Sequence, residues 1–97
     1  MLAFGGFVDY LACMNSKQRK TLVAVFAGPA SANVEWSDIE GLLLAVGCTL
    51  VEGNGSRVRF VCKDVVAAFH RPHPAKEAKR YQVRDAREFL IKIGVTP

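Results

Sequence analysis

The polar side chains that gather in this sequence are basic, and they lie in its second half. They are Arg57, Arg59, Lys63, His70, Arg71, His73, Lys76, Lys79 and Arg80. Arginine and lysine are poor ligands for cations but good hydrogen-bond donors to phosphate oxygens. We therefore predict a nucleic-acid-binding surface formed by Arg57, Arg59, Lys63, Arg71, Lys76, Lys79 and Arg80.

Two histidines, His70 and His73, flank the dipeptide Arg71-Pro72 within this basic set. Imidazole exchanges protons near neutral pH. Cleavage of RNA without a metal needs a base for the 2′-hydroxyl and an acid for the leaving oxygen, and nearby cations stabilise the charged transition state. His73 and His70 are therefore the catalytic candidates. The alternative is that both are structural groups in a proline-rich connector.

Other kinds of catalytic site are not indicated. The sequence has no P-loop, no G-x-G-x-x-G, no H-E-x-x-H and no nucleophile elbow. The carboxylates are scattered, and Cys13, Cys48 and Cys62 are too far apart for a zinc site. We expect no metal and no cofactor. The cysteine usage is typical of a reduced, cytoplasmic protein, with Cys48 and Cys62 as small core residues.

Length and charge narrow the class of protein further. A chain of 97 residues suits one small domain, and 51% hydrophobic with 23% charged residues is ordinary globular composition. No apolar run is long enough to cross a membrane. The formal net charge of +4 is concentrated after residue 47. A basic half favours an acidic partner, with nucleic acid first and a solvated basic surface as the alternative.

The first 13 residues differ from the rest, because they are apolar apart from Asp9 and two glycines. Met14 and the polar residues after it resemble a natural start. We predict that residues 1–13 are a leader or a flexible N-terminus and that residues 14–97 form the domain. The alternative is an N-terminal element that packs on the core.

The sequence pattern predicts two helices before the basic half. The first spans residues 17–27 and ends at Gly28-Pro29. The second starts at Ser37, with Glu40 at the spacing of a capping box, and ends at Gly47. Its buried face comprises Ile39, Leu42, Leu43 and Val46.

Three strands and a final helix follow. The strands are predicted at residues 48–52, 56–62 and 65–70, with turns at 53–55 and 63–64, and the helix at 78–93. The result is an α+β fold of two layers, with a three-stranded antiparallel sheet and helices on one face, in the order αα-βββ-α. The core would contain Leu43, Phe60, Phe69, Phe89 and Leu90. The outer sheet face would carry Arg57 and Arg59, with His70 as a further candidate.

Over residues 34–95 the chain resembles the HicA family of type II toxin–antitoxin systems. The motifs are Leu43-x-x-x-Gly47, Gly53-Asn54-Gly55-Ser56, the basic strand 57–61, His73-Pro74, and Phe89-Leu90-x-x-x-Gly94. The resemblance implies a fold similar to that of double-stranded-RNA-binding domains. It also implies an endoribonuclease toxin that acts on mRNA and is neutralised by a HicB-like antitoxin.

The sequence departs from the family at one important position. HicA toxins typically carry their catalytic histidine directly after the Gly-Ser turn, whereas here Arg57 follows Ser56. Arginine stays protonated and is a poor general base. Either the base has moved to His70 or His73, of which His73 has the better family match through Pro74, or the protein binds RNA without cutting it. A protein-interaction domain with an acidic partner is the third hypothesis.

Overall fold

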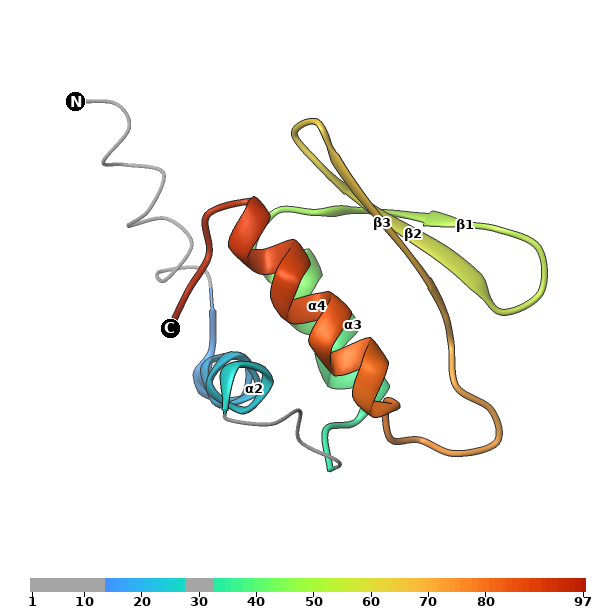
Figure 1. The fold of residues 1–97 in the computed structure, drawn as a ribbon, viewed down its shortest axis with the longest axis horizontal. Coiled ribbons are helices and arrows are strands. Elements are labelled where there is room, and N and C mark those ends of the chain that lie inside the picture. Colours follow the sequence, from blue (N-terminus) through green and yellow to red (C-terminus); the bar gives the residue numbers. More distant parts are fainter. Residues whose placement is uncertain (1–13, 28–32) are drawn as a thin grey trace.

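A computed structural model describes residues 14–27 and 33–97 of the chain, and Figure 1 shows their arrangement. Along the described residues the elements are α2 (Ser16–Phe26), α3 (Trp36–Ala45), β1 (Thr49–Glu52), β2 (Arg57–Cys62), β3 (Val65–His70) and α4 (Arg80–Lys92). This order confirms the predicted α+β fold. The predicted leader, residues 1–13, and the predicted helix stop at Gly28-Pro29 lie outside the described residues.

The three strands form one antiparallel sheet in the order β1-β2-β3, so β2 is central. Along β2 the side chains alternate as predicted. Val58, Phe60 and Cys62 are buried, while Arg57 and Arg59 are exposed. Gly55 has φ +61° in the turn between β1 and β2, a conformation that glycine adopts at little cost. The alternation makes the inner face apolar and leaves the arginines on the outer face.

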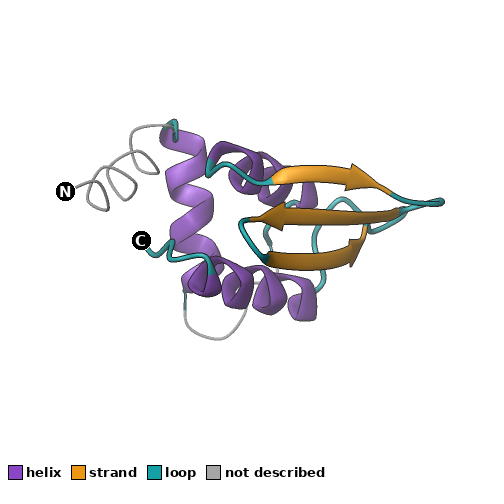
Figure 2. Ribbon diagram, turned by 90° about the horizontal axis from the view of Figure 1, so that it is seen from above, coloured by secondary structure: helices purple, strands orange, loops and turns teal. Residues whose placement is uncertain are grey.

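Helices α3 and α4 cover the inner face of the sheet, and α2 packs against these two helices (Figure 2). The aromatic rings of Trp36 on α3 and Phe69 on β3 have centroids 5.1 Å apart, and those of Phe60 and Phe69 are 6.1 Å apart. Aromatic pairs at these separations stabilise a core beyond the area they bury. The predicted core is confirmed, because Leu43, Phe60, Phe69, Phe89 and Leu90 are all buried.

Helix α2 is joined to the rest of the domain at its C-terminal end. Its buried residues include Leu22 and Val25. Arg87, which projects from α4, donates from Nε to the carbonyl oxygen of Val25 at 2.8 Å. A cation at a helix C-terminus satisfies free carbonyl groups and opposes the negative end of the helix dipole. Arg87 therefore links the first and last described helices.

The predicted capping box at Ser37 and Glu40 is wrong. Helix α3 begins one residue earlier, at Trp36, and its N-cap Glu35 makes no side-chain cap bond. Glu40 accepts hydrogen bonds from the indole Nε1 of Trp36 and from Nε of Arg71 instead. The bond to Arg71 joins two opposite charges, whereas a capping box would pair the Glu40 carboxylate with a backbone N–H that carries only a partial charge. The tertiary partner has therefore displaced the local one.

Cys48 and Cys62 are buried, as predicted. Burial raises the pKa of the Cys48 thiol to about 12, and the neighbouring Cys62 adds to the effect. A thiol with such a pKa stays protonated and unreactive at neutral pH. Among the described helices, none is both long and apolar enough to span a bilayer.

Candidate functional site

The outer face of the sheet carries Arg57 and Arg59, as the alternation in the sequence predicted. Both arginines are exposed on β2, whereas Val58 between them and Phe60 after them are buried. In the pairing of β2 with β3, Arg57 lies opposite His70 and Arg59 lies opposite Ala68. Directly opposite residues share one face of a sheet. His70 is therefore on the outer face with both arginines.

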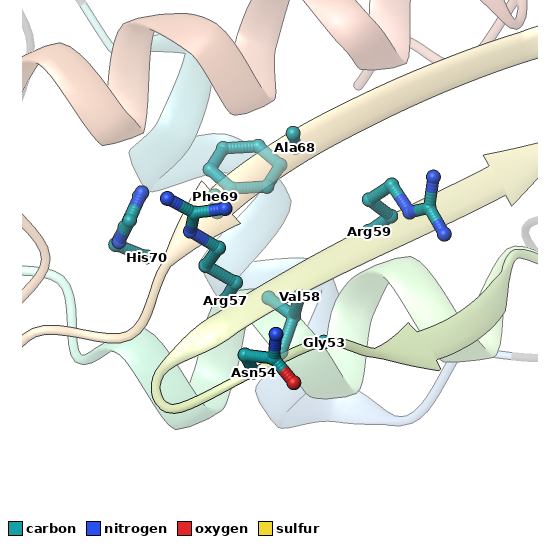
Figure 3. A pocket seen from close by; sticks show the side chains of 8 residues that line it. All are labelled: Gly53, Asn54, Arg57, Val58, Arg59, Ala68, Phe69 and His70. Carbon is teal, nitrogen blue, oxygen red and sulfur yellow. The ribbon is translucent and has the colours of Figure 1, made fainter.

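These side chains border a hollow of about 520 Å³ at the hairpin end of the sheet. Figure 3 shows Arg57 and His70 side by side, Arg59 farther along β2, and Asn54 at the turn between β1 and β2. The hollow thus presents two guanidinium groups, an amide and an imidazole. This set of donors suits an anionic ligand such as a phosphodiester.

His73 occupies a different place. It is exposed in the connector between β3 and α4, outside the set of residues that line the hollow. The connector is attached to the segment before α3 by two backbone bonds. The Trp36 N–H donates to the Lys76 carbonyl at 2.9 Å, and the Ala78 N–H donates to the Val34 carbonyl at 2.7 Å. The structure therefore separates the two predicted histidines between a sheet face and a loop.

The predicted lysines and arginine outside the sheet are exposed. Arg80 is the first residue of α4, Lys79 is its N-cap, Lys76 lies in the connector before it, and Lys63 lies in the turn between β2 and β3. The first turn of α4 has no acidic residue. The N-terminal end of a helix is the positive end of its dipole, so the dipole does not stabilise cations there. An external anion at this end would be attracted by both the dipole and the cations. Lys63 is at the opposite end of β2 from Arg57, away from the hollow.

Arg71 has carboxylate partners within the chain. Its Nε lies 2.6 Å from Glu40 Oε2, and Nη1 and Nη2 lie 2.8 and 3.0 Å from the two oxygens of Glu52. These bonds raise the pKa of the Arg71 guanidinium. The same hydrogen bonds hold the pKa of the Glu52 carboxyl below its usual range. The Arg71 donors are thus largely occupied by carboxylates of α3 and β1 rather than directed to an external phosphate.

Gln82 is a site residue that the sequence reasoning missed. It is 2% exposed on α4, and its Nε2 donates to the carbonyl oxygen of His70 at 2.6 Å. Nothing in the local pattern marks it, because a glutamine beside the buried Val83 also fits the polar side of a helix. Among residues 14–27 and 33–97, no three His, Cys, Asp or Glu side chains are grouped so that they could hold a metal ion.

A protein-family model matches the chain over the region that contains the sheet. The model described as the HicA toxin of bacterial toxin–antitoxin matches residues 36–95, which is more than half of the chain. Neither a search of curated proteins nor a search of solved structures found a match. The matched range runs from the first residue of α3 to just beyond α4, so it contains the whole sheet and the hollow. The chain therefore belongs to the HicA family, which makes it a toxin of a bacterial toxin–antitoxin pair with a cognate antitoxin as its partner.

Proposed function

We propose that this toxin is a metal-independent endoribonuclease whose general base is His70. The observation that carries the proposal is the pairing of Arg57 with His70 across β2 and β3. By the family resemblance, Arg57 stands where HicA toxins carry their catalytic histidine. The imidazole of His70, on the directly opposite residue, provides a proton-accepting group on the same face of the sheet. The two strands are about 4.8 Å apart.

The proposed reaction uses the groups around the hollow. The neutral imidazole of His70 removes the proton from an RNA 2′-hydroxyl, and the 2′-oxygen attacks the adjacent phosphorus. The bond from phosphorus to the 5′-oxygen breaks, and that oxygen takes a proton from solvent. The products are a 2′,3′-cyclic phosphate and a 5′-hydroxyl end. Arg57 and Arg59 stabilise the negative charge that develops on the phosphate oxygens.

RNA would extend from the hollow onto the other exposed cations. The start of α4 and the connector before it supply Lys76, Lys79 and Arg80 as phosphate contacts, while Lys63 lies farther from the hollow. We leave Arg71 out of the proposed interface, because Glu40 and Glu52 occupy its donors. The natural substrate of such a toxin is cytoplasmic mRNA, and its cleavage blocks translation.

The position of His70 supports a different ranking of the two histidines from the one that the sequence favoured. The resemblance favoured His73 through the following proline, but His73 lies in the connector, whereas His70 shares its face with both arginines. A base must lie within hydrogen-bond reach of the proton that it removes while the phosphate is held nearby. Among the two histidines of the chain, His70 meets that requirement better.

The experiment is RNA cleavage by the purified protein in buffer with EDTA, comparing wild type, His70→Ala and His73→Ala. We expect His70→Ala to cleave at least about a hundredfold more slowly, as loss of a general base does. His73→Ala should stay near wild type, and all three proteins should melt alike. Equal cleavage by wild type and His70→Ala would contradict the assignment of the base.

The second candidate is an RNA-binding toxin that does not cut RNA. One observation favours it: Arg57, which stays protonated, follows Gly55-Ser56, where the family resemblance places a catalytic histidine. Salt-sensitive RNA binding by a wild-type protein that never cleaves RNA would support this function. A protein that shows no salt-sensitive RNA binding would instead favour the third hypothesis, a basic face that binds an acidic protein.

A further inference from the structure

We propose that Gln82 and Arg71 are positioning residues that hold the peptide group carrying His70. The inference rests on the proposed function, because it assigns these two residues the task of orienting the proposed base. Neither side chain needs to touch RNA. Both act on the last residue of β3 and the first residue of the connector.

The peptide group between His70 and Arg71 is fixed at both of its polar atoms. Its carbonyl oxygen accepts a hydrogen bond from Gln82 Nε2 at 2.6 Å. Its N–H donates to the carbonyl oxygen of Ser56 at 2.8 Å. A peptide group is planar, so two bonds on opposite sides define the orientation of its plane. That plane contains the His70 Cα, so the two bonds fix the backbone atom from which the imidazole projects.

Gln82 is itself held in one orientation. Its Oε1 accepts a hydrogen bond from the backbone N–H of Lys79 at 3.0 Å, which leaves Nε2 directed to His70. The residue is almost completely buried, so both ends of the amide require partners. Gln82 therefore connects the N-terminal end of α4 to the end of β3.

Arg71 fixes the next residue from the other side. Its guanidinium bridges Glu40 on α3 and Glu52 at the end of β1. Glu40 also accepts a bond from the indole of Trp36, which is buried. Planar guanidinium–carboxylate pairs are directional, and lysine does not reproduce them. The residue after His70 is thereby tied to two further elements of the fold.

The bonds from Gln82 and Arg71 matter because His70 lies at the end of a strand. His70 is the last residue of β3, which is an edge strand of the three-stranded sheet. Strand ends open locally at low cost. A displacement of about 1 Å at a reacting group can lower a rate about a hundredfold. A base at a fraying strand end would therefore lose efficiency unless its backbone were held from outside the strand.

The test measures kcat and KM for cleavage of a short RNA by Gln82→Met, Arg71→Ala and Arg71→Lys. Arg84→Ala is the matched control, because Arg84 lies on the surface of α4 with a side chain 61% exposed. Exchange of the backbone amide hydrogen of residue 71 is measured in the same proteins by NMR and compared as a protection factor. It reports directly on the peptide group and does not depend on activity. Thermal melts identify any variant that does not fold.

We expect Gln82→Met and Arg71→Ala to lower kcat by about tenfold to a hundredfold, with KM within about twofold of wild type. Arg71→Lys should recover only part of the loss, Arg71 amide exchange should accelerate, and Arg84→Ala should match wild type. If Gln82→Met does not fold, the Arg71 series carries the test.

Unchanged kcat in the folded variants would overturn the proposal. A raised KM and a smaller salt dependence with kcat retained would also overturn it, because Arg71 would then be a phosphate ligand. A wild-type protein that does not cleave RNA refutes the proposed function and the orienting role together. Cleavage by wild type with fully active variants refutes only the orienting role.

Discussion

Arg57 and His70 face each other across β2 and β3, at the end of the sheet beside the turn of residues 53–55. The next pair inward, Val58 and Phe69, is buried against the helices. A shift of one residue between the strands would either turn Phe69 of β3 to the outer face or turn Arg57 and Arg59 of β2 toward the core. The hydrophobic core therefore fixes the pairing of Arg57 with His70 on the outer face.

The first prediction concerns RNA binding by the two arginines of β2. If Arg57 and Arg59 each contact a phosphate, the double variant Arg57→Ala/Arg59→Ala should bind more weakly. The slope of log K against log salt concentration should fall by about 1.4 to 1.8, because two phosphate contacts are lost. Fluorescence anisotropy of labelled RNA at several salt concentrations measures this slope.

The control for that experiment is Lys17→Ala/Lys20→Ala, which removes the same number of cations from α2, a helix that packs on α3 and α4. Lys17 also pairs with Asp38 at 3.3 Å, so a thermal melt checks that this variant is folded. It should leave the slope near the wild-type value. Equal losses in the two double variants would show that net charge, rather than the sheet face, governs binding.

The second prediction concerns the core under the sheet. Phe89 on α4 is 3% exposed. Phe89→Ala should lower the free energy of unfolding by about 3–5 kcal/mol, which includes the cost of the cavity. That loss is a large share of the stability of a small domain. Tyr81→Ala on the same helix is the control, since Tyr81 is 48% exposed. Urea unfolding followed by circular dichroism should show a large shift only for Phe89→Ala.

Much of the fold was predictable because its signals are local. The alternation of Val58 and Phe60 with exposed arginines identified the inner face of β2. Gly47, with φ +103°, ends the helix region as predicted, since few other residues adopt that conformation at low cost. These features depend on residues within a few positions of one another, so the pattern of the sequence contains them.

The candidate site was predictable only in part. Arg57, Arg59 and His70 were placed correctly because strand alternation and hairpin pairing are regular. The partners of Arg71 were not, because Glu40 and Glu52 lie 31 and 19 residues away in the sequence. No local pattern encodes which arginine meets which carboxylate. The same holds for Gln82, whose bond to the His70 carbonyl joins α4 to β3.

The third prediction concerns the dependence of stability on pH. Hydrogen bonds from Arg71 lower the pKa of Glu52 in the folded state. The ion pair therefore contributes stability above the unfolded-state pKa, about 4.3, and this contribution is lost as pH falls through the lower folded-state pKa. Between pH 7 and pH 2, the melting temperature of the wild type should fall further than that of Glu52→Gln. Parallel curves for the two proteins would mean that the exposed pair adds no measurable stability.

The last prediction tests whether the base has moved one strand across the sheet. His70→Arg should lower RNA cleavage by at least about a hundredfold, because the outer face then lacks its imidazole. Adding Arg57→His to that variant places an imidazole at the position where the family resemblance implies one, on the same face and about 4.8 Å away. The exchanged protein should recover at least about a tenth of wild-type activity, since its net charge and the side chains of the face are conserved.

His73 is intact in all of these proteins. Equal cleavage by wild type, His70→Arg and the exchanged protein would therefore identify His73 as the base. An exchanged protein that folds and binds RNA but cleaves no faster than His70→Arg would show that the two paired positions are not equivalent.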